Sequence, residues 1–163
     1  MKSEIVARIV KCEPKKLVGL SVTMSLVNNL TGQLWGRMGP EIKTIVDRAS
    51  DDKISLQVYP SDYYLAFNPA REFEKWALVE VTSSDQVSEY LKTFELEGGL
   101  YAVFDYKGSS NDPSIFQYIF SQWIPQSEYA VDDRPHFEVL GANYRNNDPK
   151  SEEEIWIPIK ARS

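Results

Sequence analysis

A carboxylate and an indole lie two positions apart in the C-terminal stretch, at Glu154 and Trp156. The pattern of residues 153–160 predicts a β-strand, in which alternate side chains share a face. The intervening isoleucines form one face of this strand, whereas Glu154 and Trp156 lie on the other. A carboxylate beside an aromatic ring suits the floor of a pocket for an apolar cation. It also suits a solvated surface, because Glu154 ends a run of three glutamates and charged residues are mostly exposed.

Other large side chains are candidates for the walls of such a pocket. Trp35 lies at the edge of the apolar stripe of a predicted helix, and Tyr118 lies off the stripe of a second one, so both can face a ligand. Met38 can supply an adaptable wall. The remaining candidates belong to predicted strands: Tyr64, Phe67, Trp76 and Tyr101. For Trp35, Trp76 and Tyr101, packing in the core is an equally good explanation.

The elements that must position these residues follow from hydrophobic periodicity. Apolar patterns predict strands over residues 5–11, 16–26, 54–59, 63–67, 74–81, 100–108, 136–140 and 153–160. Helices are predicted over residues 31–49 and 113–124. Gly39-Pro40 should kink the first helix, unless a new helix starts at Pro40. Residues 86–93 are expected to be a helical turn or an irregular connection.

The order of these elements indicates an α+β fold with an internal duplication. The second half runs strand, helix, strand, strand, as the first half does, although no residue-level repeat is evident. We expect one domain over residues 1–163, with halves of about 1–82 and 98–163. A groove between the halves is the natural place for a ligand.

Composition restricts the function. The 163 residues carry a net charge of −6 and no long basic run, which argues against a nucleic-acid-binding surface. No signal region or membrane-spanning stretch is evident. A single cysteine, Cys12, fits a reducing cytoplasm. The only histidine, His136, is expected in a charged turn, so Cys–His and metal-dependent schemes lack parts, and no metal or cofactor is expected. A monomer and a homodimer through an exposed sheet edge both remain open.

Several motifs resemble the GyrI-like small-molecule-binding family, also called the AraC-type effector-binding domain. They span nearly the whole chain, and the second half carries the most specific ones: residues 34–38, 59–60 and 73–81, then 99–108, 123–125, 132–138 and 154–159. The chain is most similar to stand-alone members, including effector-binding proteins of integron cassettes. His136 stands where an acidic residue is usual, at what we expect to be a surface turn.

The resemblance implies two pseudo-twofold β-α-β-β modules, with antiparallel sheets and two main helices around a central groove. That groove is lined by aromatic residues, and the acidic residue at its base maps onto Glu154. Such members bind bulky apolar, often cationic compounds, which implies sensing or sequestration of toxic molecules, or transcription regulation through a partner regulator. No helix-turn-helix precedes Ile5, so direct DNA binding is not expected.

The resemblance leaves two alternatives open. Some GyrI-like proteins resemble hydrolases of electrophilic, cyclopropane-bearing compounds, in which a carboxylate and a tyrosine activate water and donate a proton. Glu154 with Tyr101 or Tyr118 would take those roles here. The family's namesake resembles an inhibitor of DNA gyrase, which would make this chain a protein-binding one.

Overall fold

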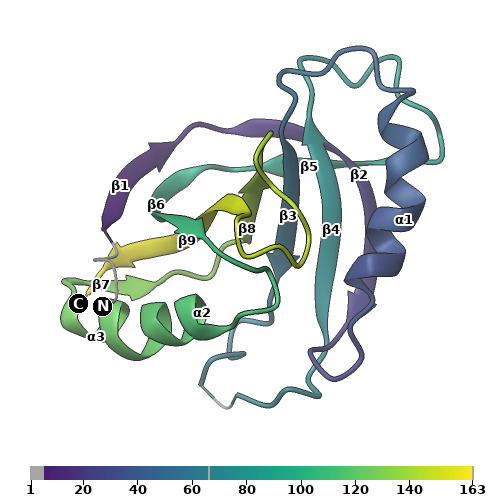
Figure 1. Ribbon diagram of the computed structural model, residues 1–163. Coiled ribbons are helices and arrows are strands. Elements are labelled where there is room, and N and C mark those ends of the chain that lie inside the picture. The colour runs from purple at the N-terminus through teal and green to yellow at the C-terminus, as the bar shows by residue number, and fades with distance from the viewer. Residues whose placement is uncertain (1–5, 66, 163) are drawn as a thin grey trace.

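The computed structural model describes residues 6–65 and 67–162, and within them nine strands form one antiparallel sheet (Figure 1). The strands are β1 (Ala7–Cys12), β2 (Lys15–Met24), β3 (Lys53–Val58), β4 (Phe73–Glu80), β5 (Lys92–Leu96), β6 (Gly99–Lys107), β7 (Tyr129–Val131), β8 (His136–Leu140) and β9 (Glu152–Ala161). Their order is β1-β6-β9-β8-β3-β4-β2-β5, and β7 pairs with the end of β9. The helices are α1 (Thr31–Ile42) and a continuous segment of α2 (Ser114–Tyr118), the π-helical turn η1 (Ile119–Trp123) and α3 (Ile124–Gln126). The predicted α+β class is confirmed.

The sheet has approximate twofold symmetry. β3 and β8 pair at its centre, and the order β3-β4-β2 on one side matches β8-β9-β6 on the other. Glu74 and Trp76 on β4 correspond to Glu154 and Trp156 on β9, because each tryptophan pairs with a residue of the central two strands. In both pairs the indole N–H donates a hydrogen bond to the glutamate two residues earlier. This repeated Glu-x-Trp is a residue-level trace of the duplication.

Each half places one helix over the same face of the sheet. In Figure 1, α1 lies at the right and α2 at the lower left. The first predicted helix, over residues 31–49, is shorter than expected: Pro40 lies inside α1, which ends at Ile42 instead of restarting. Proline cannot donate to the preceding turn, so the helix ends soon after it. The second predicted helix is confirmed and contains the π-helical turn.

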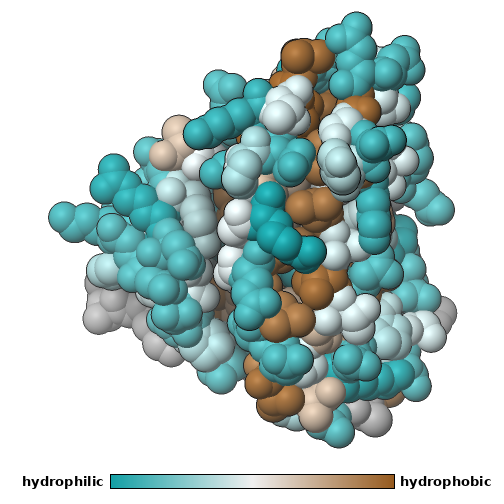
Figure 2. Space-filling model, turned by 90° about the vertical axis from the view of Figure 1, so that its right-hand side faces the viewer, coloured by the Kyte–Doolittle hydropathy of each residue, from teal (hydrophilic) through white to brown (hydrophobic). Residues whose placement is uncertain are grey.

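Three apolar clusters hold the layers together. One lies on the sheet face away from the helices and includes Leu56, Trp76, Tyr101 and Phe137. The other two lie beneath the helices, one under α1 and one under α2, where the isoleucines of β9 are buried. The outer surface beside α1 is mainly hydrophilic, with a narrow band of apolar side chains (Figure 2). Between the two helices, the centre of the helix-bearing face is left without an apolar cover.

Some predicted boundaries are wrong. Residues 63–65 form turns, with the Tyr63 N–H donating to the Pro60 carbonyl over 2.9 Å, because the Pro60-Ser61-Asp62 turn overrides the strand propensity of the tyrosines. The edge strands β5 and β7 were not expected, since each is short and only weakly apolar. The predicted strand start at Ile5 lies outside the described residues.

Candidate functional site

A groove of about 1240 Å³ lies between α1 and α2, over the junction of the two halves. Its floor comes from the central strands β3, β4, β8 and β9, and its side walls from the two helices. Aromatic residues close one end, and a polar loop closes the other. The residues that the argument uses are Trp35, Ser55, Gln57, Tyr63, Tyr64, Phe67, Lys75, Phe116, Phe120, Glu138 and Glu153.

The floor is polar although it lies at the centre of a sheet. Ser55 and Gln57 on β3 and Lys75 on β4 are each at most 6% exposed, and Glu138 on β8 is partly buried. Alternation along the strands places these four side chains on the helix-bearing face, opposite the apolar cluster. Gln57 Nε2 donates a hydrogen bond to Glu138 Oε1 over 3.3 Å. Buried polar groups of this kind are costly unless something pairs with them, so the floor has the character of a binding surface.

Two carboxylates face each other across the floor. Burial raises the pKa of Glu138, while Lys75 and the hydrogen bond from Gln57 oppose that rise. Burial, and then the charge of Glu138, raise the pKa of Glu153 to about 7, against a smaller opposing effect of Lys75. Burial lowers the pKa of Lys75, and the two glutamates oppose this. The floor is therefore a site whose charge depends on pH near neutrality.

Stacked aromatic rings form the closed end of the groove. Tyr64 stacks on Phe120 of η1 at a centroid distance of 4.7 Å and on His136 at 5.7 Å. Tyr63 is 2% exposed, and its hydroxyl is one of two buried side-chain polar atoms without a hydrogen-bond partner in the described part of the chain. Phe67 is exposed at the same end. Flat apolar surfaces and one free hydroxyl are thus available to a bound molecule.

Three of the nine predicted ligand-binding residues line this groove: Trp35, Tyr64 and Phe67. Met38 is fully buried under α1, and Tyr118 packs in the cluster beneath α2. On the second helix the groove is lined instead by Phe116 and Phe120, which the sequence pattern assigned to the core. Both flanks of the helix's apolar stripe are aromatic, and the stripe alone does not tell which flank faces the groove.

The other predicted residues lie on the opposite face of the sheet. Trp76, Tyr101 and Trp156 belong to the apolar cluster there, and Trp156 stacks on Phe137 at 5.1 Å. Tyr101 is fully buried, and its hydroxyl donates to the Pro135 carbonyl over 2.8 Å.

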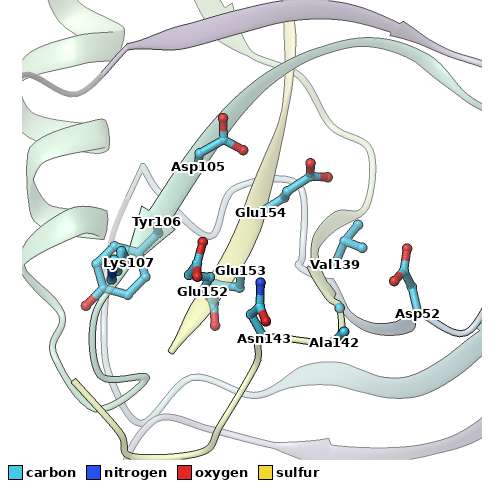
Figure 3. Close-up of a pocket in the computed structure, with 11 residues that line it drawn as sticks. Asp52, Asp105, Tyr106, Lys107, Val139, Ala142, Asn143, Glu152, Glu153 and Glu154 are labelled. Carbon is cyan, nitrogen blue, oxygen red and sulfur yellow. The ribbon is translucent and has the colours of Figure 1, made fainter. Parts of the chain in front are cut away.

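Glu154 is not on the floor of the groove. It lines a smaller hollow of about 350 Å³, where its carboxylate lies beside that of Asp105 from the neighbouring strand (Figure 3). Arg8 donates to both carboxylates, at 2.9 Å to Asp105 and 3.1 Å to Glu154. Glu153, one residue earlier, borders both hollows. A step of one residue along a strand changes the face, so the acid of the groove is Glu153.

The residues of the hydrolytic alternative are not brought together. Glu154 lies in the smaller hollow, Tyr101 is buried with its hydroxyl bonded, and Tyr118 packs beneath α2. His136 is not in a surface turn, because it is 5% exposed on β8 and pairs with Gln57. Burial, and secondarily the charge of Arg134, lower the pKa of His136 to about 3, so its imidazole is neutral at physiological pH.

Sequence reasoning missed the floor, although a signal for it exists. In β3 the polar residues Lys53, Ser55 and Gln57 alternate with Ile54 and Leu56. In a strand with partners on both sides and a helix layer above, both faces would be apolar if the face were simply covered. A polar face on a central strand therefore indicates an open, functional surface.

Within the described residues, no helix is both long and apolar enough to cross a membrane. In the same part of the chain, no group of three histidine, cysteine or acidic side chains is arranged to hold a metal ion.

Comparison with solved structures shows the same fold in proteins of low sequence identity. SAV2435 bound to tetraphenylphosphonium matches with a TM-score of 0.71 and 17% identity, covering 95% of this chain and 94% of that one. The integron cassette protein VCH_CASS2 from the mobile metagenome of Vibrio cholerae matches with a TM-score of 0.64 and 17% identity, covering 94% and 95%. A hydrolase encoded by lin2189 of Listeria innocua matches with a TM-score of 0.61 and 9% identity, covering 94% and 91%. These likenesses show the fold, which hosts more than one function.

Comparison of the sequence itself is more specific. No curated protein matches the chain. A family model, Cass2, described as an integron-associated effector binding protein, matches residues 8–159. The match extends over almost the whole chain and confirms the resemblance carried by its motifs. The protein therefore belongs to the Cass2 family of integron-associated effector-binding proteins.

Proposed function

We propose that this protein binds bulky apolar cations in the groove between α1 and α2. The observation that carries the proposal is the position of two carboxylates, Glu138 and Glu153, on a floor enclosed by aromatic walls. A cation that displaces water from this floor gains charge attraction in a site of low dielectric constant. Aromatic contacts add about 0.5–2 kcal/mol each. Several contacts of this size give micromolar affinity with little selectivity.

The similar proteins support the choice of ligand class. SAV2435 has this fold and was solved with tetraphenylphosphonium, a bulky apolar cation. In our proposal, binding serves to sense or sequester toxic compounds in the cytoplasm, and any effect on transcription passes through a partner regulator. The −6 net charge fits this indirect route, since it disfavours contact with DNA phosphates.

The proposal is tested by titrating the protein with tetraphenylphosphonium and following intrinsic tryptophan fluorescence. Trp35 lines the groove, whereas Trp156 lies on the other face of the sheet. We expect saturable quenching with micromolar affinity. Trp35→Phe should remove most of this quenching and weaken binding less than about tenfold, because phenylalanine keeps an aromatic contact.

The matched control is Trp156→Phe, which should leave the ligand-induced quenching unchanged. Absence of saturable quenching, together with absence of binding in equilibrium dialysis, would overturn the proposed function. Quenching that persists in Trp35→Phe but disappears in Trp156→Phe would place the ligand on the opposite face of the sheet.

A further inference from the structure

Lys75 has no function in a site that takes a simple cation. It lies in the middle of β4, is 6% exposed and lines the groove. Among the described residues, ion pairs within 4.0 Å involve the side chains of Arg8, Lys15, Arg71 and Arg134, so the Lys75 ammonium has no carboxylate at that distance. Lysine is almost never this buried unless it is paired.

The twofold symmetry shows that packing does not require a lysine at this position. Lys75 lies between Glu74 and Trp76, as Ile155 lies between Glu154 and Trp156. Ile155 is fully buried in the cluster beneath α2. An apolar residue thus satisfies the equivalent position in the other half, and the cost of burying an ammonium group in β4 indicates a partner that comes from outside the chain.

Charges of opposite sign occupy opposite sides of the floor. The strands follow in the order β4-β3-β8-β9, which places Lys75, Gln57, Glu138 and Glu153 one after another across the sheet. Neighbouring strands lie about 4.8 Å apart, so the backbones at Lys75 and Glu138 are about 10 Å apart. This spacing suits two charged groups on one molecule of drug size.

We infer that the groove selects amphoteric ligands, in which a bulky apolar cation also carries an anionic group. The cation lies over Glu138 and Glu153, and the anion is bound by the ammonium of Lys75. This inference rests on the proposed function and assigns the second half of the recognition to Lys75. A cation without an anionic group is repelled by Lys75 and binds about tenfold more weakly.

Two dyes that differ by one charge test the inference: rhodamine B, which is a zwitterion, and its ethyl ester, which is a cation with the same ring system. Fluorescence anisotropy at pH 8 gives the affinity for each dye. We expect the wild-type protein to bind the zwitterion about tenfold more tightly than the ester. Lys75→Met should weaken binding of the zwitterion and strengthen binding of the ester, so that the preference is lost or reversed.

The control is Lys53→Met, which removes an exposed lysine from the edge of the same groove and should leave the preference unchanged. Equal affinity of the wild-type protein for the two dyes would overturn the inference without any variant, and the proposed function would stand. An equal effect of Lys53→Met and Lys75→Met would overturn the assignment to Lys75. If the wild-type protein binds neither dye and also fails to bind tetraphenylphosphonium, the proposed function itself fails.

Discussion

Replacing Glu153 with glutamine is expected to lower the affinity of the groove for tetraphenylphosphonium at pH 8 by about 10- to 100-fold. Glu153 lines the floor and is ionised at that pH, because its pKa is about 7. Glutamine keeps the shape and loses the charge, so the change in affinity reports the electrostatic contribution. Isothermal titration calorimetry on the wild type and the variant measures it.

The pH dependence of the same reaction gives an independent test. Below pH 7 the Glu153 carboxyl of the free protein becomes protonated, so wild-type affinity for the cation should fall by about tenfold per pH unit between pH 7 and 5. Glu153→Gln should be nearly flat over that window. Burial also raises the pKa of Glu138, which adds to the loss in both proteins toward the acidic end.

Stability should change in the opposite direction to binding. The folded-state pKa of Glu153 is raised from 4.5 to about 7, so the folded protein binds more protons than the unfolded chain between these values. The stabilising effect of its burial is complete below pH 4.5 and is lost as the pH rises through 7. Glu153→Gln should therefore raise the melting temperature at pH 8 while it weakens binding.

Glu154→Gln is the matched control, since it changes the neighbouring residue on the other face of the strand. Its carboxylate pairs with Arg8, and both side chains are more than a third exposed, so its loss should cost under about 1 kcal/mol of stability. Its affinity for the cation should be that of the wild type. An equal loss of affinity in both variants would show that the field of the whole acidic stretch, rather than the floor, attracts the cation.

The comparison of Glu153 with Glu154 shows how far the sequence could lead. Alternation correctly separated Glu154 and Trp156 from the isoleucines of β9, and it predicted the strand itself. It could not say which face the helices cover, because that depends on packing between segments far apart in the chain. The isoleucines are buried beneath α2, the groove lies on their side, and the acid one position earlier is the one that reaches it.

The second helix shows the same limit. Periodicity found the helix and its apolar stripe, and Ile115 and Ile119 are indeed buried. Phe116 and Phe120 lie on one flank of that stripe and line the groove, whereas Tyr118 lies on the other flank. Local sequence fixes the stripe, but only the position of α1 across the sheet decides which flank has a ligand site beside it.

Arg134 is expected to be the side chain whose conservative replacement destabilises the protein most among those considered above. Its guanidinium donates to the carbonyls of Gly98 at 2.9 Å, Leu100 at 2.6 Å and Ile159 at 3.0 Å, and its Nε donates to Asp132 at 2.7 Å. These bonds fasten the start of β6 and the end of β9 to the segment before β8. The motif around Arg134 is therefore structural, and the ring of Tyr101 beneath the guanidinium, at 4.9 Å, belongs to the same arrangement.

Arg134→Lys should lower the free energy of unfolding by about 2–4 kcal/mol, because a lysine keeps the charge but cannot reach three carbonyls and a carboxylate from one ammonium. The melting temperature should fall by about 5–15 °C, measured by circular dichroism. Arg37→Lys, on the exposed side of α1, should leave it within about 2 °C. Similar small shifts in both variants would contradict the role given to the guanidinium. Since Arg134 lies away from the groove, the folded Arg134→Lys protein should retain its affinity for tetraphenylphosphonium, which separates the structural motif of the family from its binding site.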